Sequence, residues 1–166
     1  MAETNYYLSA RSYKSKRQYD SAREHYLKAI QTGDSKGYYG LTVLAEEMGA
    51  DADALTSKYA ECFEPIKKSA LDGDPIAASI IGVYYAMGLG ETKQDPESAH
   101  LWFLVGALGG DEVAQFNLAV HYYLGVAVHP NTPLALHWLE AAINKGYEPA
   151  IHLIAEIKAN TSKPNN

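Results

Sequence analysis

Four stretches of the chain align with one another without gaps, and this internal repetition limits the possible folds more than any other feature. The stretches begin at Ala22, Cys62, Ala99 and Ala135. Each contains a glycine eleven residues after its first residue, and these glycines are Gly33, Gly73, Gly110 and Gly146. Successive glycines lie 40, 37 and 36 residues apart. A period of this length is typical of a protein that stacks one supersecondary unit on the next.

Each aligned stretch has the residue pattern of a closely packed helix. Its first position is small, the position four residues later is apolar or aromatic, and the position seven residues later is small again. Offsets of four and seven place these side chains on one face of an α-helix. The middle positions are Tyr26, Ile66, Phe103 and Leu139. Because glycine readily adopts the left-handed conformation that ends many helices, the pattern predicts a helix end at each repeated glycine.

A second helix is expected after each glycine. The segments ASIIGVYYAMG from Ala77 and AQFNLAVHYYLG from Ala114 are largely apolar, and Asp74 and Asp111 before them are suitable N-caps. No segment alternates as a strand does, so we predict an all-α fold of antiparallel helix pairs. The predicted pairs span residues 4–31, 34–72, 75–108 and 111–144, and a closing helix spans residues 148–159.

The units that begin at Ala77 and Ala114 resemble the Sel-one-like repeat, a relative of the tetratricopeptide repeat. The matching residues are Ala77, Ile81, Gly82, Tyr85, Gly88, Gly90, Ala99, Trp102, Ala107 and Gly110, and then Ala114, Leu118, Ala119, Tyr122, Gly125, Ala135, Trp138, Ala142 and Gly146. The N-terminal unit is closer to the tetratricopeptide pattern, with Ala10, Tyr13, Ala22, Tyr26 and Ala29. The resemblance covers residues 4–159.

The resemblance implies a right-handed α-solenoid of about four antiparallel helix pairs plus a C-terminal capping helix. Residues 1–159 would then form one domain, and residues 160–166 a disordered tail. We expect Ile151, Ile154 and Ile157 to form the packing face of the capping helix. The second unit departs most from the family, because GADADALTSK adds about three residues and Pro65 is expected to kink the following helix.

In solenoids of this kind the first helix of each pair lines the concave surface, so the resemblance implies a set of partner-binding residues. They are Tyr7, Arg11, Lys14, Tyr39, Val43, Glu46, Glu47, Ser79, Val83, Met87, Phe116, Val120, Tyr123, Leu124, His152 and Glu156. This surface is apolar and aromatic in its middle and charged at its ends, a composition that favours protein binding. The alternative for each of these side chains is packing against a neighbouring helix.

Two tyrosine pairs occur near the ends of the expected first helices. Tyr85 and Tyr122 occupy the same repeat position, and the resemblance implies that both pack between helices. Tyr123 lies about 100° further round the helix from Tyr122, so we expect it to face the groove. Tyr84 aligns with His121 and does not belong to the repeated pattern, so its role stays open.

Charge narrows the possible partners. The 166 residues are 47% hydrophobic and carry a formal net charge of −6. Residues 1–36 hold a net +3 and residues 37–166 a net −9, which argues against general nucleic-acid binding. The cluster of Arg11, Lys14, Lys16 and Arg17 would suit an acidic partner, or it forms a solvated helix end.

The sequence also indicates a compartment. No run of about 18 apolar residues is present, and the N-terminal segment lacks the apolar stretch of a signal peptide, so we expect no membrane insertion. Cys62 is the one cysteine of the chain and cannot form an internal disulfide, which favours a cytoplasmic location. We further expect a monomer.

The chain lacks the sequence motifs of common catalytic and metal sites. Its six histidines form no HExxH pattern, and Cys62 has no CxxC partner. Neither GxSxG nor a phosphate-binding loop occurs; GLGETK at residues 88–93 lacks the required spacing and is better explained as a turn between helices. We therefore predict that the protein is not an enzyme and uses no metal and no cofactor.

These observations predict a scaffold or adaptor that binds another protein or a peptide through its concave surface. Proteins that resemble this family act mainly in protein–protein assembly, often in bacteria. The alternative is a bacterial immunity protein that neutralises a cognate toxin by occluding it. The net charge of −9 beyond residue 36 would suit a basic toxin.

Overall fold

The structure is a computed structural model that describes residues 5–161, and these residues form helices joined by turns and loops. The helices are α1 (Tyr6–Ser15), α2 (Tyr19–Gln31), α3 (Lys36–Glu47), α4 (Ala52–Leu71), α5 (Pro75–Met87), α6 (Pro96–Leu108), α7 (Glu112–Leu124), α8 (Thr132–Asn144) and α9 (Glu148–Thr161). No strand occurs within residues 5–161. The all-α prediction is confirmed, and each helix pair lies within its predicted range.

Helix ends form where the repeats predict them. Asp74 accepts hydrogen bonds from the N–H groups of Ile76 and Ala77, at 2.9 and 3.1 Å, and Asp111 accepts one from Ala114 at 2.8 Å. The repeated glycines have φ values of 86°, 97°, 89° and 84° in chain order. Residues with a Cβ adopt such values only with strain, so the glycines allow the turn that ends the second helix of each pair.

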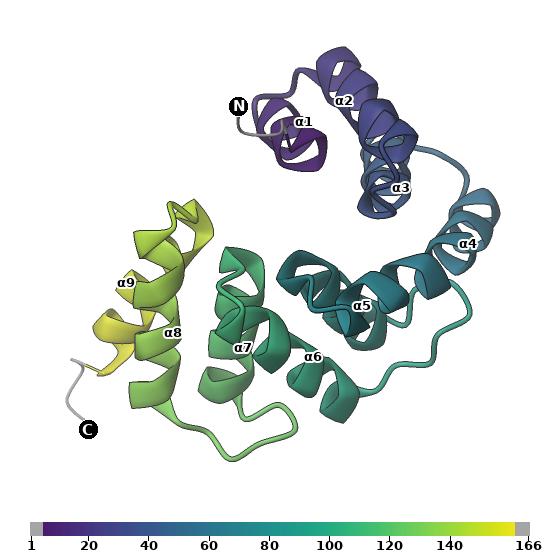
Figure 1. Ribbon diagram of the computed structural model, residues 1–166. Coiled ribbons are helices and arrows are strands. Elements are labelled where there is room, and N and C mark those ends of the chain that lie inside the picture. The colour runs from purple at the N-terminus through teal and green to yellow at the C-terminus, as the bar shows by residue number, and fades with distance from the viewer. Residues whose placement is uncertain (1–4, 162–166) are drawn as a thin grey trace.

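The helices follow one curved path (Figure 1). Helices α1, α5 and α7 lie toward the inside of the curve, whereas α2, α4 and α6 lie on its outer side. Most helix contacts join neighbours in the chain, as expected of a solenoid. The curvature also brings α1 near the start of α7, where Arg11 Nη2 lies 3.0 Å from Glu112 Oε1.

The irregular second unit is accommodated by a longer helix. Helix α4 has 20 residues, whereas α5, α6, α7 and α8 have 13 each. The extra residues of the GADADALTSK segment extend α4 at its N-terminus, because Asp51 caps it by accepting hydrogen bonds from the N–H groups of Asp53 and Ala54. Pro65 lies inside α4 without ending it, next to the fully buried Ile66.

Two glycines allow helices to approach closely beneath aromatic rings. A Cβ on Gly82 would lie 2.5 Å from the Phe103 ring, and a Cβ on Gly40 would lie 2.2 Å from the Tyr26 ring. Both distances are far shorter than van der Waals contact, so neither position has room for a larger residue. Phe103 and Tyr26 occupy the same repeat position and are 2% and 1% exposed. The sequence correctly predicted that position to be a packing position.

Tyr84, whose role the sequence left open, is fully buried. Its ring lies 5.9 Å from those of Tyr39 and Tyr59 and 5.3 Å from that of Phe63, measured between centroids. Its hydroxyl donates a hydrogen bond of 2.9 Å to the backbone carbonyl of Tyr59. Tyr85, at the repeated tyrosine position, is only partly buried and packs between two core clusters. Tyr84 therefore joins α3, α4 and α5.

In α7, as in α5, the buried ring lies one residue before the repeated tyrosine position. His121, which aligns with Tyr84, is the buried residue, and Tyr122 and Tyr123 are both partly buried. Tyr122 packs against a cluster that includes Phe103, as the resemblance implied. Tyr123 packs against a different cluster, which includes Leu139 of α8. The expectation that Tyr123 faces the groove does not match this arrangement, because α8 and α9 pack on that side of α7.

Helix α9 packs against α8 at the end of the solenoid. Ala150 and Ile157 are fully buried, and Leu153 and Ile154 pack against the same cluster. Ile151 is 51% exposed, so its predicted place on the packing face was wrong: the buried face follows offsets of three, four and seven from residue 150. Residues 160 and 161 belong to α9 rather than to the predicted disordered tail, and residues 162–166 lie outside the described residues.

Tyr84 gives a test of this packing. We expect Tyr84→Ala to lower the free energy of unfolding by roughly 3 to 5 kcal/mol, because it leaves a large cavity among three helices. Tyr84→Phe should cost about 0.5 to 1.5 kcal/mol, since it removes the hydrogen bond to the Tyr59 carbonyl and leaves the ring in place. Met87, on the same helix, is 66% exposed, and Met87→Ala should change stability by no more than about 0.5 kcal/mol. Urea denaturation measures all three, and equal effects of Tyr84→Ala and Met87→Ala would contradict the assignment.

Candidate functional site

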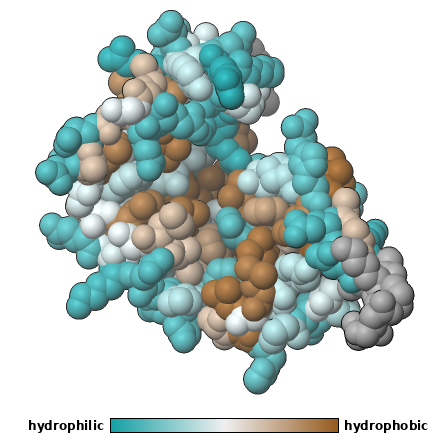
Figure 2. Space-filling model, turned by 180° about the vertical axis from the view of Figure 1, so that it is seen from behind, coloured by the Kyte–Doolittle hydropathy of each residue, from teal (hydrophilic) through white to brown (hydrophobic). Residues whose placement is uncertain are grey.

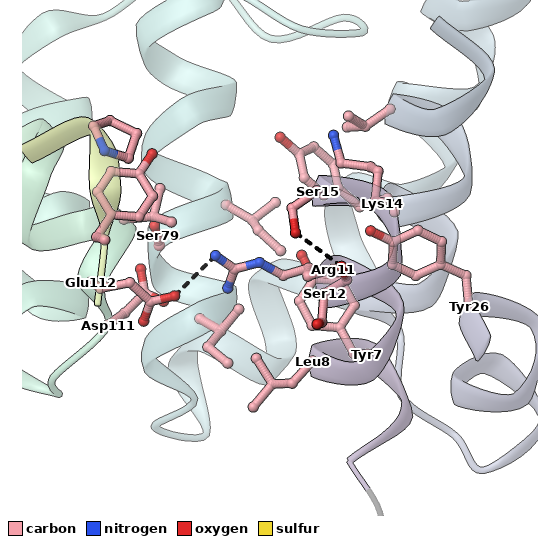
Figure 3. A pocket seen from close by; sticks show the side chains of 18 of the residues that line it. Tyr7, Leu8, Arg11, Ser12, Lys14, Ser15, Tyr26, Ser79, Asp111 and Glu112 are labelled. Atoms are coloured by element: carbon pink, nitrogen blue, oxygen red, sulfur yellow. Dashed lines mark hydrogen bonds and ion pairs between the residues drawn. The ribbon is translucent and has the colours of Figure 1, made fainter. Parts of the chain in front are cut away.

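The inside of the curve holds an open cavity of about 1210 Å³. Its lining comes from α1, α2, α3 and α5, from the start of α7, and from the turn before α9 with the first residues of that helix. In Figure 3, Arg11 extends from α1 toward Glu112, with Asp111 beside Glu112 and with Tyr7 and Tyr26 on the α1 side. Because every repeat contributes to the lining, the cavity depends on the curvature of the whole solenoid.

Half of the predicted partner-binding residues line this cavity. They are Tyr7, Arg11, Lys14, Tyr39, Val43, Glu47, Ser79 and Val83. The other half do not line it, and they are Glu46, Met87, Phe116, Val120, Tyr123, Leu124, His152 and Glu156. The predicted residues of α1 and α5 meet across the cavity, whereas those of α7 and α9 do not reach it.

The residues outside the cavity have other surroundings. The Glu46 carboxylate accepts a hydrogen bond of 2.7 Å from the Tyr59 hydroxyl, which joins α3 to α4. The Phe116 ring packs on that of Tyr147, with 5.3 Å between centroids. Leu124 is 62% exposed at the end of α7. The register of α7 therefore turns its predicted face toward α9 and solvent, and only the first residues of α7 contribute to the cavity.

Sequence reasoning missed the cavity residues that lie at helix starts. Asp111 and Glu112 come directly after the repeated Gly110, and Tyr147 directly follows Gly146. Their common position after a repeated glycine was visible in the alignment of the four stretches. Asp111 was predicted only as a helix cap, because the curvature that directs this position toward the cavity is a property of the stacked repeats.

The charged side chains of α1 are paired within the chain. Arg11 pairs with Glu112, and Lys14 Nζ pairs with Glu47 Oε1 at 2.5 Å. Lys16 and Arg17 are exposed at the cavity edge. Two of the four cations in the predicted basic cluster therefore bind acidic residues of other repeats, which leaves a basic edge at α1 opposite an acidic wall at α7.

Asp111 is the buried charge of that acidic wall. It is 3% exposed, and its Oδ1 accepts the N–H of Ala114 at 2.8 Å. Its Oδ2 is buried and has no hydrogen-bond partner among the described residues. Burial raises the pKa of the Asp111 carboxyl above its ordinary value, and the Ala114 N–H and the nearby Ser79 and Arg11 side chains only partly oppose this rise. A buried carboxylate without a cation is costly, so Asp111 is an unusual feature of the cavity.

A pair of buried histidines lies outside the cavity. The rings of His100 (α6) and His121 (α7) stack with centroids 5.5 Å apart, and each residue is 7% exposed. The Nδ1 atoms of both are buried without a hydrogen-bond partner among the described residues. Burial, and then the neighbouring His100, lower the pKa of His121 to about 4, and burial lowers the pKa of His100. Both rings are neutral at pH 7 and pack against Phe103 and Tyr122 as part of the core.

Within residues 5–161, no group of three or more His, Cys, Asp or Glu side chains could hold a metal ion. No helix in that part of the chain is long and apolar enough to cross a membrane. The lining of the cavity includes aromatic rings, aliphatic side chains, serine hydroxyls and ion pairs.

The curved stack of helix pairs around a cavity defines an α-solenoid protein. Three segments, residues 2–34, 75–111 and 113–147, match the model of the Sel1 repeat. These segments make up more than half of the chain, which therefore belongs to the Sel1 repeat family. Such repeats generally mediate protein interactions. The unmatched residues 35–74 hold the long α4, in agreement with the prediction that the second unit departs most from the family.

Several known proteins are similar to this chain in sequence or in fold. An uncharacterized protein of Neisseria meningitidis serogroup B is 34% identical over 99 residues, which cover 60% of this chain and 21% of that protein. The crystal structure of a Sel1 repeat protein from Oxalobacter formigenes has a TM-score of 0.67 at 25% identity, over 88% of this chain and 56% of that one. A protective antigen of uropathogenic Escherichia coli with an SLR fold has a TM-score of 0.65 at 21% identity, over 96% of this chain and 34% of that one. This chain thus spans well under two thirds of each of these proteins.

The histidine pair predicts a pH dependence of stability. The pKa of folded His121 is about 4, below the ordinary value of 6.5, so the unfolded chain binds a proton more readily. Its contribution to stability is therefore complete above about pH 6.5 and is lost as the pH falls toward 4, by up to roughly 3 kcal/mol. Urea denaturation between pH 7 and pH 4 measures this loss.

Two variants isolate the histidine effect from other acid-sensitive groups. His121→Phe keeps a ring at a position that holds a tyrosine in α5, so its stability should fall less steeply with pH than that of the parent protein. His129 is exposed in the loop before α8, and His129→Phe should keep the parent's pH dependence. Indistinguishable curves for the parent and His121→Phe would rule out the buried pair as the cause.

Proposed function

We propose that the protein is a scaffold or adaptor that holds a segment of a partner protein in the cavity on the inside of the solenoid. The observation that carries this proposal is the cavity of about 1210 Å³, to which every repeat contributes. A single-repeat pocket could exist on any solenoid, but a cavity shared by all repeats offers a continuous surface to an extended or helical segment.

The lining has the composition of a protein-binding surface. Tyr39 and Tyr147 are partly buried and line the cavity together with Val43 and Val83, and the buried Tyr7 also belongs to the lining. Tyrosine is enriched at protein interfaces because it offers a large contact area at a small cost in side-chain entropy. On the face seen in Figure 2, apolar residues form a band through the middle of the molecule with hydrophilic residues around it, which also resembles the core and rim of an interface.

A second apolar surface lies on the outer side and competes with the cavity as a binding site. Leu101, Val105 and Leu108 of α6 are 61%, 49% and 71% exposed and recur at offsets of four and seven. They form one stripe along α6, which lies on the outside of the curve (Figure 1). An experiment on function must therefore distinguish the two surfaces.

The second candidate function is that of an immunity protein that occludes a toxin. The net charge of −9 in residues 37–166 supports it, since an acidic surface attracts a basic toxin and speeds association. Both candidates place the partner in the cavity. They differ in the activity of the partner, because only the immunity function requires a partner that is toxic when it is not bound.

Photo-crosslinking in the native cell tests the proposal. Leu8 lines the cavity and is 42% exposed, and Leu27 on the outer helix α2 has the same exposure, so the two positions form a matched pair. With p-benzoylphenylalanine at Leu8, we expect capture of one partner protein; with the same residue at Leu27, we expect no such capture. A third variant carries the probe at Val105 of α6.

The outcomes separate the surfaces and the functions. Capture from Val105 but not from Leu8 would place the partner on the outer stripe and contradict the proposal. Equal capture from Leu8 and Leu27 would show non-specific contact and would also contradict it. If the partner captured from Leu8 kills cells and an equimolar amount of this protein abolishes the killing, the immunity function is supported over the adaptor function.

A further inference from the structure

A buried lysine at the start of α3 shows how this fold accommodates a cation. Lys36 is 7% exposed, and its Nζ pairs with Asp34 Oδ1 at 2.9 Å and with Asp74 Oδ2. Its ammonium also lies 5.8 Å from the centre of the Tyr7 ring, which lines the cavity. Asp74 is the N-cap of α5, so Lys36 links the starts of two successive repeats. The site thus consists of two helix-start aspartates, one lysine and one tyrosine ring.

The next repeat has the same acceptor without the lysine. Asp111 caps α7 as Asp74 caps α5, one residue after the repeated glycine in both cases. The residue that aligns with Lys36 is Ile76, three residues after Gly73. Ile76 and Asp111 both line the cavity. Between α5 and α7 the chain therefore has the carboxylate of Asp111, but the position that aligns with the lysine holds the aliphatic Ile76.

The pKa values of Asp74 and Asp111 shift in opposite directions, as expected if only Asp74 is bound by a lysine. Although burial acts to raise it, the pKa of Asp74 lies below its ordinary value, because Lys36 and two backbone N–H groups bind the carboxylate. The pKa of Asp111 is raised, with burial as its largest cause. Arg11 is the nearby cation, but its guanidinium binds Glu112. The Ser79 side chain also favours the ionised Asp111, but it carries no charge. Asp111 Oδ2 therefore has no cation bound to it among the described residues, and a cation of the right reach would stabilise it.

We propose that a lysine side chain of the partner protein enters the cavity and binds Asp111, as Lys36 binds Asp74 within the chain. This inference rests on the proposed function and names the chemistry of the partner that the cavity selects. The aliphatic stem of the lysine would lie along Ile76, Ile80 and Val83, which line the approach. Glu112 adds a second carboxylate beside Asp111, so the wall keeps an excess negative charge even with Arg11 in place.

Short peptides with one lysine test the inference directly. The probes are acetyl-Ala-Ala-X-Ala-Ala-amide, in which X is lysine or the uncharged norleucine of similar length, and methylamine is the small-amine probe. Amide chemical shifts of the isotope-labelled protein follow the binding of each probe. We expect the lysine peptide to shift the amides around Asp111 and Ala114 and to bind roughly tenfold or more tightly than the norleucine peptide, because only lysine pairs with the carboxylate.

Asp111→Asn is the matched variant, because asparagine is also a good N-cap and can still accept the Ala114 N–H. It should remove the preference for lysine over norleucine, while Glu140→Gln, which makes the same charge change at an exposed position of α8 outside the cavity, should keep it. Equal binding of the two peptides, or a lysine preference that survives in Asp111→Asn, would overturn the inference. Methylamine that binds as tightly as the lysine peptide would also overturn it, since the site would then recognise a small amine and not a side chain of a partner.

A variant that supplies the lysine from within the chain tests the geometry of the contact without any ligand. Ile76→Lys places a lysine where the alignment with Lys36 requires it. We expect a higher Tm and loss of lysine-peptide binding in the parent background, and no rise in Tm in the Asp111→Asn background. A change in Tm that is the same in both backgrounds would overturn the inferred position of the ammonium.

This design separates the inference from the function on which it rests. If the lysine preference is absent but p-benzoylphenylalanine at Leu8 still captures a partner, the cavity binds that partner by other contacts and the inference alone is overturned. If Leu8 captures nothing, the proposed function fails, whatever the peptides show.

Discussion

Close approach of helices at positions without room for a side chain is the constraint on which this structure depends. The rings of Tyr26 and Phe103 occupy the space that a Cβ on Gly40 or Gly82 would need. Such contacts set the distance and the angle between successive helices, and a solenoid repeats that step along its length. The curvature, the cavity and the meeting of α1 with α7 all result from this repeated step.

Much of the fold could be predicted from the sequence, because the features that determine a helix are local. The left-handed turn at Gly73 and the cap at Asp74 are properties of a few adjacent residues, and the structure has both where the repeats predicted them. Tyr84 could not be assigned from the pattern. Its burial depends on Tyr59 and Phe63 of α4, in the unit that departs most from the family. Pattern matching is weakest where a unit is irregular, and here that unit provides the surroundings of the buried ring.

The candidate site was predictable in part, and the limit has a physical reason. Residues of α1 and α5, such as Tyr7 and Val83, were placed correctly beside the cavity because their helices keep the regular register of the family. Tyr123 and Phe116 were not, because α8 and α9 pack on the side of α7 that the pattern assigned to the groove. The ion pair between Arg11 and Glu112 joins residues 101 positions apart, and no local pattern contains that information. Contacts across the curve depend on the small rotations of several repeats added together. They are therefore harder to predict from sequence than contacts between neighbouring helices.

The Arg11–Glu112 pair has a consequence for how such a chain can change over evolutionary time. Solenoids commonly gain or lose whole units, because each unit contacts only its neighbours and an insertion leaves the others undisturbed. Here one partner belongs to the first unit and the other to the start of the fourth, so they meet only at the present number of intervening units. Duplicating or deleting a unit between them would carry Glu112 along and around the curve, away from Arg11. The contact across the interior therefore ties the shape of the cavity to the present number of units.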